Sequence, residues 1–415
     1  MNTTQKNYSL QPLRGMKDHL PSEQERYRQI QNICIQTAQC FRYQEVSTPL
    51  IENIEIFSKT VGEDIIGKEL YQFKDKGDNS VALRPEGTAG IVRLALNANL
   101  LTSLPLRLCY HGPMFRYERP QKGRFRQFHQ CGVEFFGEKS PQAELEIIQM
   151  ADMILKKLNI QTKLLINTIG DEESRRHYKT ALVQYLKPFQ KELSPESQTR
   201  LLKNPLRILD SKSTQDKKIL ESAPLPKNFL NKNSKIFYDQ VLSLLSKNNI
   251  SCQQTDFLVR GLDYYSDTVF EFTSSELGAQ NAVLAGGRYD QLIEMMGGRP
   301  CPAIGWACGL ERLALLSSLE SVQKLTVAVL STSEELNDTA FKIASDLRFQ
   351  GFIVYLPNMQ NPFKKQMKTA HKASCSHVLI LGTEEWKEGK IILKNMKTGQ
   401  QTLLDKNLNH FKLSP

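Results

Sequence analysis

Apolar and polar positions at the amino-terminal end of the chain predict a long helix followed by a strand. Apolar residues recur at helical spacing from residue 22 to residue 40, and Ser22 followed by Glu25 predicts a capping box at the start of this helix. Residues 43–49 have the composition of a strand that ends at a proline. We therefore expect a helix that leads directly into a strand.

Two pairs of strands are predicted after this unit. Segments 71–74 and 80–83 flank the turn sequence KDKGDN, and two longer segments, about 106–118 and 124–136, flank the short basic loop RPQKG. Short loops of this composition suit hairpins. We expect antiparallel pairing within both pairs.

The chain changes in character over about residues 171–250. This segment is lysine-rich and mostly helical, and prolines interrupt it, which indicates an inserted helical subdomain. Strand patterns return at residues 256–259 and 268–273. The string AGGRYD at 285–290 predicts a turn, and a helix is expected to begin near Cys308.

After Lys324 strand and helix patterns alternate. The apolar runs TVAVL, FIVYLP and HVLILG are separated by helical patterns at about 336–349 and 362–373, which is typical of a small α/β domain with parallel strands. We therefore predict a first domain of residues 1–325, which contains the helical insertion, and a second domain of residues 326–415.

Composition favours a cytoplasmic protein without a membrane span. Of the 415 residues 40% are hydrophobic and 24% are charged, and the amino terminus MNTTQKNYSL lacks the apolar core of a secretory signal. No apolar stretch approaches the roughly 20 residues that cross a bilayer. The eight cysteines form no CxxC pair, so we predict no zinc site, no other protein-bound metal and no disulfide framework, and expect most of the thiols to be buried.

The net charge of +10 is concentrated in two segments. Residues 171–250 hold 15 Lys and Arg against 9 Asp and Glu, residues 326–415 hold 12 against 8, and the remainder balances. A phosphate backbone would be attracted to such segments, but solvated protein surfaces often carry the same excess. Charge alone leaves both interpretations open.

The most informative segment is FRYERPQKGRFRQFHQCGVEFFG. Five side chains of its second strand lie at even intervals: Arg124, Arg126, Phe128, Gln130 and Glu134. The two-residue period of a strand places them on one face, which is too polar for a core. That face offers cations for phosphate, a ring for stacking and polar groups for a substrate, while Arg116 and Glu118 share a face of the partner strand. A merely exposed polar face is the alternative.

These strands resemble the second signature motif of the class II aminoacyl-tRNA synthetases. The motif carries Phe-Arg-x-Glu and a later Arg and Phe, here Phe115-Arg116-Tyr117-Glu118, Arg124 and Phe128. The first motif, which forms the dimer interface in the class, resembles helix 22–40 with its following strand. The third resembles AIGWACGLERLAL, with Gly309-Leu310-Glu311-Arg312 at the start of a helix.

Further strings are similar to the histidyl-tRNA synthetases within this class. They are LVRGLDYYSDTVFEF, AGGRYD, RGMKDHLP and LRPEGTAG, so the resemblance covers nearly the whole chain. One departure is Arg42, where the family commonly has glycine, and it leaves only a local helix stop in question. A catalytically silent relative and another class II ligase are the alternatives. The first usually lacks the carboxy-terminal domain or the arginines, and the second is disfavoured by RGLDYY and by the lack of zinc ligands.

The resemblance implies a fold and an activity. The fold is an α+β catalytic domain built on an antiparallel sheet with flanking helices, with a helical insertion and a small α/β anticodon-binding domain. The activity is the activation of L-histidine with ATP to histidyl-adenylate and pyrophosphate, then transfer of histidine to the 3′-terminal adenosine of tRNA(His) with release of AMP. We expect a homodimer that takes ATP together with Mg²⁺. Four lysines at helical spacing either contact RNA or form a solvated face: Lys364, Lys365, Lys368 and Lys372.

The resemblance also assigns ATP-binding residues. In the family, Arg116 and Arg260 correspond to catalytic residues that face the α-phosphate, and Arg124 and Arg312 to residues near the γ-phosphate. Phe128 and Arg312 correspond to residues that sandwich the adenine. The whole ATP-binding set is Arg116, Glu118, Arg124, Phe128 and Arg312. From the residues alone, an ion pair of Arg260 with Asp263 or Asp267 stays open.

A histidine-binding site needs an anion for the α-ammonium group and a polar partner for each imidazole nitrogen. The family positions that line it correspond to Glu86, Gly87, Thr88, Arg116, Gln130, Glu134, Arg260, Tyr264 and Tyr265. From the residues alone, the favoured interpretation of Glu86 is a helix-terminal charge, and that of the two tyrosines is core residues. A site that hydrogen-bonds its substrate discriminates by about 10⁴ to 10⁵ against analogues, so we expect no editing domain.

Overall fold

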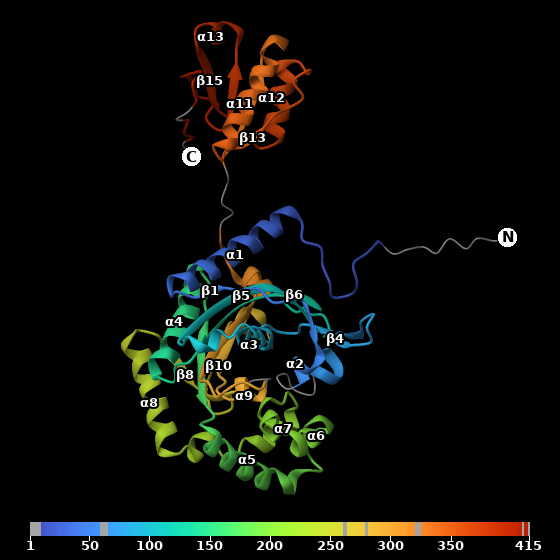
Figure 1. Ribbon diagram of the computed structural model, residues 1–415, viewed down its shortest axis with the longest axis vertical. Helices are drawn as coiled ribbons and strands as arrows, with labels where there is room; N and C mark the ends of the chain where they lie inside the picture. Colours follow the sequence, from blue (N-terminus) through green and yellow to red (C-terminus); the bar gives the residue numbers. More distant parts are fainter. Residues whose placement is uncertain are drawn as a thin grey trace, which may run out of the picture. The chain divides into compact units, whose positions relative to one another are not determined.

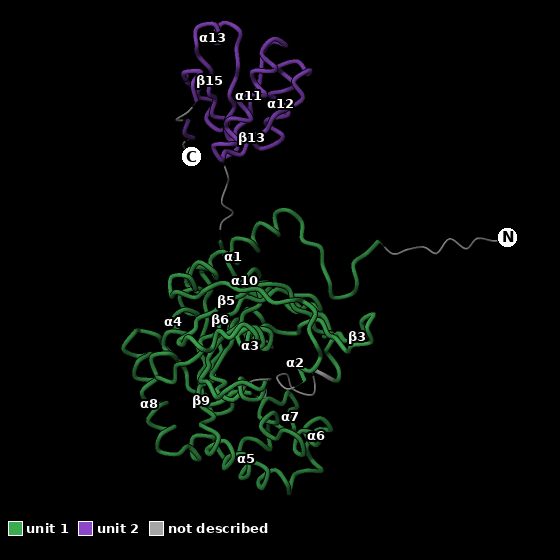
Figure 2. Tube along the Cα trace, in the orientation of Figure 1, with its two compact units in different colours: residues 1–319 green, residues 320–415 purple. Residues whose placement is uncertain are grey.

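The computed structural model describes residues 10–58, 65–259, 264–278, 281–319, 325–408 and 411–413. The chain divides into two compact units, Met1–Leu319 and Glu320–Pro415 (Figure 2). Among the described residues, no helix combines the length and the apolarity that a membrane span requires.

The first unit is built on an eight-stranded sheet in the order β1-β5-β6-β11-β10-β9-β7-β8 (Figure 1). Its strands are β1 (Gln44–Glu45), β5 (Leu106–Phe115), β6 (Gln127–Phe136), β7 (Lys163–Thr168), β8 (Cys252–Gln254), β9 (Ser266–Thr273), β10 (Ala282–Arg288) and β11 (Ala303–Gly309). All pairs from β5 to β7 are antiparallel, whereas the outer pairs β1–β5 and β7–β8 are parallel. The predicted antiparallel sheet is confirmed, apart from its two edges.

Both predicted hairpins are present. Strands β3 (Gln72–Lys74) and β4 (Ser80–Leu83) pair antiparallel, and β2 (Ile51–Asn53) completes a small second sheet in the order β2-β4-β3. Strands β5 and β6 also pair antiparallel, but they are shorter than predicted. The chain between them turns back on itself, because the N–H of Arg124 donates to the carbonyl of Gln121 over 2.8 Å.

Helices cover both faces of the large sheet. They are α1 (Pro21–Cys40), α3 (Thr88–Asn97), α4 (Pro141–Lys157), α8 (Lys232–Lys247), α9 (Leu292–Met295) and α10 (Leu310–Leu316), whereas the short helix α2 (Ile54–Ser58) packs against α3 and the small sheet. Helices α1, α4, α8 and α10 contribute to one apolar core with Val133 and Phe135 of β6. Helices α3 and α9 contribute to a second apolar cluster on the other face, with Tyr110, Phe136 and Tyr289. Because strand residues alternate between faces, β6 contributes to both.

The two ends of α1 bear on the predicted capping box and on the helix stop at Arg42. The capping box is wrong: the helix begins at Pro21 after Leu20, which makes no side-chain capping bond, so Ser22 is already inside the first turn. Proline suits this position because its fixed φ fits the helix and its missing N–H needs no partner. At the other end Arg42 adopts a φ of +63°, so the helix stops without the glycine that this conformation favours.

Two predictions between α8 and α10 are wrong. Residues 256–259 form no strand, and the edge strand β8 lies just before them, with the Thr255 N–H bonded to the carbonyl of Ile166. The segment AGGR belongs to strand β10 rather than to a turn. Its glycines are needed inside the sheet, since a Cβ on Gly286 would lie 2.2 Å from the carbonyl oxygen of Gly305.

The segment predicted as a helical insertion is helical. After α5 (Glu172–Leu186) it contains α6 (Pro195–Lys203), the 3-10 helix η4 (Pro205–Asp210), α7 (Thr214–Leu220) and then α8. Tyr178, Leu182, Leu201 and Ile208 belong to an apolar cluster of its own. Asp171 caps α5, because its carboxylate accepts the N–H of Ser174 over 2.9 Å.

The second unit contains a five-stranded sheet in the order β13-β12-β14-β15-β16. Its elements are β12 (Thr326–Ser331), α11 (Asn337–Phe349), β13 (Ile353–Tyr355), α12 (Phe363–Lys372), β14 (His377–Leu381), α13 (Thr383–Lys387), β15 (Lys390–Asn395) and β16 (Gln401–Asp405). The parallel pairing of β13, β12 and β14 confirms the prediction. The antiparallel strands β15 and β16 were not predicted. Strand β16 is largely exposed, and an exposed strand lacks the continuous apolar run on which the prediction depended.

Candidate active site

The carboxylate of Glu134 lies at the centre of a group of buried polar side chains. Glu134 is only 1% exposed and lies on β6 between Leu108 of β5 and Gly305 of β11. A Cβ on Gly305 would lie 2.0 Å from Glu134 Oε2, so this glycine leaves the room that the carboxylate occupies. We name the Glu134 cluster by its members: Glu86, Thr88, Tyr110, Glu134, Tyr264, Tyr265 and Tyr289.

Two hydroxyl groups hold the Glu134 carboxylate. Thr88 Oγ1 donates to Oε1 over 2.7 Å, and the Tyr289 hydroxyl donates to Oε2. Burial raises the pKa of Glu134 to about 8, although both hydrogen bonds oppose this shift. The carboxyl group therefore keeps its proton at neutral pH.

Glu86 is a second buried carboxylate, at the start of α3. It accepts the backbone N–H groups of Thr88 over 2.6 Å and of Ala89 over 2.9 Å, and burial raises its pKa. The helix-terminal interpretation of Glu86 is therefore correct as far as it goes. The hydrogen bonds also fix Thr88, which in turn holds Glu134.

Tyrosines surround these carboxylates. The Tyr264 ring lies 4.9 Å from that of Tyr265 and 5.6 Å from that of Tyr289. Tyr264 is buried in the second apolar cluster, so the core interpretation of this residue is also correct. The Tyr110 ring fits between two glycines, because a Cβ on Gly87 or Gly132 would lie within 2.4 Å of it.

Two buried polar atoms, one in this cluster and one beside it, have no hydrogen-bond partner among the described residues. They are the Tyr110 hydroxyl and Oε1 of Gln130, which lies on the same face of β6 as Glu134. An unpaired buried polar group costs about 1–3 kcal/mol. A polar substrate at this position would remove that cost.

An arginine cluster, Arg116, Arg124 and Arg312, lies beside this face. Glu118 bridges two of its members, with Oε2 2.6 Å from Arg124 Nη1 and Oε1 3.7 Å from Arg116 Nη1. The Arg116 guanidinium lies 5.4 Å from the ring centroid of Phe128, and its Nε donates to the carbonyl of Pro85 over 2.8 Å. Arg116 thus joins the start of α3 to the hairpin of β5 and β6.

The pKa of Arg312 reflects its position among the other cations of this cluster. Burial and the neighbouring Arg124 guanidinium lower its pKa, although the carboxylates of Glu118 and Glu271 oppose this shift. Its Nη1 donates to the carbonyl of Ala282. A bound anion would be stabilised at this position by several cations at once.

The structure brings most of the predicted site residues together. Glu86, Thr88, Glu134, Tyr264 and Tyr265 meet in the Glu134 cluster, with Gly87 beneath Tyr110. Arg116, Glu118, Arg124, Phe128 and Arg312 lie around the arginine cluster, and Gln130 lies on β6 between the two groups. Arg260 and Asp263 lie outside the described residues. Asp267, a possible partner of Arg260, pairs with Lys139 over 3.0 Å.

The predicted common face of five residues is only partly correct. Phe128, Gln130 and Glu134 lie on one face of β6, but Arg124 and Arg126 precede the strand. Arg126 lies 3.6 Å from the ring centroid of Tyr117 and is not part of the arginine cluster. The face is also more apolar than predicted, since Phe136 is fully buried on it and Phe128 packs there.

Sequence reasoning missed Tyr289 and the charges that support it. Arg288, fully buried, bonds Glu144 Oε1 over 2.8 Å and Asp290 Oδ1 over 3.0 Å, which fixes the chain on both sides of Tyr289. Glu311 had no predicted role, and it accepts the N–H of His129 over 2.9 Å, which ties α10 to β6. The string AGGRYD was the available signal for Tyr289, but it was interpreted as a turn.

The raised pKa of Glu134 predicts a pH-dependent stability. The unfolded chain loses this proton near pH 4.5, whereas the folded protein holds it to about pH 8, so the stabilisation from protonated Glu134 is lost as the pH rises through this interval. Relative to Glu134→Gln, the free energy of unfolding should fall by roughly 1 kcal/mol per unit between about pH 5 and about pH 8. Urea unfolding in a Trp386→Phe background, with Trp306 fluorescence as the signal, measures this in the first unit.

Glu276→Gln removes an exposed carboxylate and keeps Glu134, so it serves as the control, and its stability curve should run parallel to that of wild type. Parallel stability curves for wild type and Glu134→Gln would contradict the raised pKa.

Known proteins resemble this chain in sequence and in fold. A family model described as histidyl-tRNA synthetase matches residues 15–170 and 183–313, and one described as anticodon binding domain matches residues 324–408. The chain is 45% identical to a histidine–tRNA ligase of Rippkaea orientalis over 404 residues, which cover 96% of this chain and 94% of that relative. It is 44% identical to one from Wolbachia pipientis over 399 residues, 95% and 97% of the two chains.

Solved structures agree with these relatives. The apo histidyl-tRNA synthetase of S. aureus has a TM-score of 0.82 at 32% identity and covers 96% of this chain and 98% of its own. A protein described as an ATP phosphoribosyltransferase regulatory subunit/histidyl-tRNA synthetase from Bacillus halodurans has a TM-score of 0.66 at 22% identity, covers 91% of this chain and 99% of its own, and shares the fold. The chain belongs to the histidyl-tRNA synthetase family.

Proposed function

We propose that the Glu134 cluster binds L-histidine and that the arginine cluster binds ATP. As a member of its family, the protein activates histidine with ATP to histidyl-adenylate and pyrophosphate. It then transfers histidine to the 3′-terminal adenosine of tRNA(His) and releases AMP. The two clusters divide the substrates of the first step between them.

The observation that carries the proposal is the buried carboxyl group of Glu134, which two hydroxyl groups hold in place. An imidazole loses its proton near pH 6.5, close to the value of about 8 for Glu134, so a single proton can lie between the two groups at neutral pH. Side chains without a titratable nitrogen cannot match this arrangement. Tyr265 is proposed as the polar partner of the second imidazole nitrogen, and Glu86 with Gln130 as the groups near the α-ammonium.

The arginine cluster fits the chemistry of adenylation. When the histidine carboxylate attacks the α-phosphorus of ATP, charge accumulates on the phosphoryl oxygens, and preorganised cations stabilise it. We assign Arg116 and Arg260 to the α-phosphate, and Arg124 and Arg312 to the γ-phosphate. Phe128 and Arg312 enclose the adenine, and Glu118 holds Arg116 and Arg124 in place. ATP is a substrate and enters with Mg²⁺ on its phosphate oxygens.

The second unit is proposed as the anticodon-binding domain, residues 326–415, and residues 1–325 as the catalytic domain with its insertion. A synthetase of this family with an anticodon-binding domain binds tRNA. Lys364, Lys365, Lys368 and Lys372 of α12 are exposed, which supports a contact with the phosphate backbone.

We also propose a cytoplasmic homodimer that forms through α1 and the segment after it. Support for the dimer comes from Leu50 and Ile51, which are 40% and 48% exposed in the single chain. Support for the compartment comes from the activity, because charged tRNA is consumed where proteins are made.

The roles of Glu134 and Arg260 predict that substitution of the first changes mainly the histidine KM and substitution of the second mainly kcat. Glu134→Gln should raise the histidine KM of pyrophosphate exchange by about 10-fold or more and change the ATP KM little, because the glutamine amide cannot share a proton with the imidazole. Arg260→His should lower kcat by about 10² to 10³ and change histidine binding little. An unchanged histidine KM in Glu134→Gln would reject the assignment of the Glu134 cluster.

The proposed division of labour predicts the behaviour of a protein that ends at Leu319, the last residue of the first unit. It should retain histidine-dependent pyrophosphate exchange and charge tRNA poorly. Its residual tRNA affinity should depend less steeply on salt, because fewer counterions are released. Circular dichroism and mass measurements first establish its fold and oligomeric state. Full kcat/KM for tRNA in the folded truncation would contradict the role of the second unit.

A further inference from the structure

The start of the helical insertion is fastened to the strand that follows Tyr264 and Tyr265. The N–H of Ile169 donates to the carbonyl of Asp267, and the N–H of Asp267 donates to the carbonyl of Gly170, both over 2.9 Å. Helix α5 begins immediately after these bonds. Its first turns are therefore held in a fixed position beside the Glu134 cluster.

Arg175, one turn into α5, reaches from the insertion to this cluster. Its Nη1 donates to the backbone carbonyl of Tyr265 over 2.8 Å, and its Nη2 donates to Oε1 of Gln291 over 2.7 Å. Gln291 lies two residues after Tyr289. One guanidinium thus joins the segment of Tyr264 and Tyr265 to the segment of Tyr289.

The position of the Tyr265 backbone determines where its ring lies. The ring packs directly against Gly287, where a Cβ would lie 2.9 Å from Tyr265 Cδ1 and 2.6 Å from the carbonyl of Thr268. A shift of the Tyr265 backbone would therefore disturb the close packing of its ring against the backbone of Gly287. The planar guanidinium has the geometry to fix both acceptors at once.

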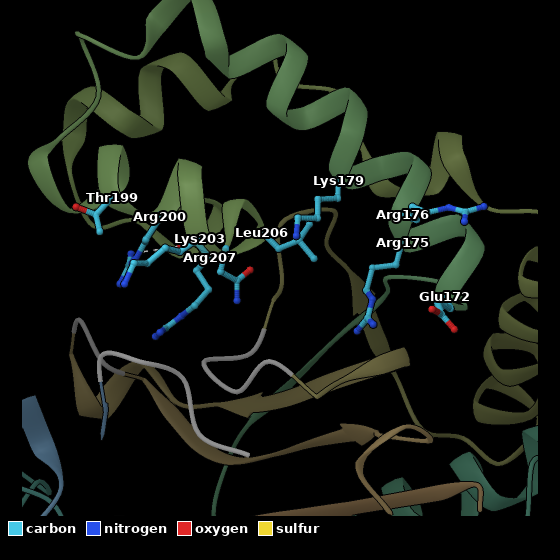
Figure 3. A pocket seen from close by; sticks show the side chains of 10 residues that line it. Glu172, Arg175, Arg176, Lys179, Thr199, Arg200, Lys203, Leu206 and Arg207 are labelled. Carbon is cyan, nitrogen blue, oxygen red and sulfur yellow. Dashed lines mark hydrogen bonds between the residues drawn. The ribbon is translucent and has the colours of Figure 1, made fainter. Parts of the chain in front are cut away.

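Arg175 also lines a basic groove of about 470 Å³ in the insertion (Figure 3). The other cations of the groove are Arg176, Lys179, Arg200, Lys203 and Arg207. Figure 3 shows the side chains of Arg175 and Arg176 leaving neighbouring positions of α5 in different directions. Arg176 is exposed, which makes it a matched control for a change of charge in the groove.

We propose that Arg175 is a positioning residue for histidine binding, which holds Tyr265 and the segment after Tyr289 in the geometry that the substrate requires. The proposal rests on the proposed function, since it takes the Glu134 cluster as the histidine site. Arg175 contacts neither reacting atom and acts through the tyrosines. It makes histidine affinity depend on the insertion, even when tRNA is absent.

The test is pyrophosphate exchange without tRNA in Arg175→Ala, Arg175→Lys and Arg176→Ala, with Glu134→Gln assayed in parallel. Arg175→Ala should raise the histidine KM by about 10-fold and leave the ATP KM within about 2-fold, because a charge-assisted bond to each segment is lost. Arg175→Lys keeps one donor and should recover part of the affinity. Arg176→Ala should match wild type.

Each other outcome has a defined meaning. An unchanged histidine KM in Arg175→Ala, with a raised KM in Glu134→Gln, overturns the positioning role and leaves the proposed function intact. Unchanged values in both variants overturn the histidine site itself and the positioning role with it. Equal losses in Arg175→Ala and Arg176→Ala would assign both residues to the charge of the groove and overturn the positioning role. If Arg175→Ala does not fold, Gln291→Ala removes one acceptor, and an unchanged histidine KM there, together with one in Arg175→Lys, overturns the proposal.

Discussion

The arrangement of the catalytic unit depends on keeping one carboxyl group, that of Glu134, out of water. Its burial requires a hydroxyl partner for each oxygen, and Thr88 from α3 and Tyr289 after β10 supply them. It also requires space, which Gly305 on the neighbouring strand provides. Elements far apart in the sequence therefore meet at one point, where burial raises the pKa of Glu134 to about 8 against the effect of these hydrogen bonds.

Two electrostatic environments lie side by side on the same hairpin. Around Glu134 most groups are buried, and burial raises the pKa of both carboxyl groups, which suits the imidazole that we propose as the ligand. Around Arg312, burial and the neighbouring Arg124 guanidinium lower its pKa, and this group of cations suits a polyphosphate. Strand β6 connects the two through Phe128, Gln130 and Glu134, so under the proposed assignments the carboxylate of histidine and the α-phosphate of ATP would meet along a single strand face.

Sequence alone predicted the hairpins, the parallel strands of the second unit and most residues of the site, because these depend on apolar period and on strings that resemble the family. It failed where tertiary contacts override local pattern. Arg126 sits at the expected even interval, yet a turn at Gln121 directs it toward Tyr117. Gly286 looks like a turn residue, yet the sheet needs its missing side chain. Tyr289 and Arg175 gain their roles only from the groups opposite them, and no periodicity reveals those groups.

The most direct test of the histidine site is amino-acid-dependent pyrophosphate exchange into ATP by the full-length protein, measured with each of the twenty amino acids at neutral pH. Histidine should support exchange, and every other amino acid should have a kcat/KM lower by about 10⁴ or more, since none of them both fits the site and shares a proton with Glu134. Exchange with another amino acid, such as glutamine or asparagine, at a kcat/KM close to that of histidine would contradict the assignment.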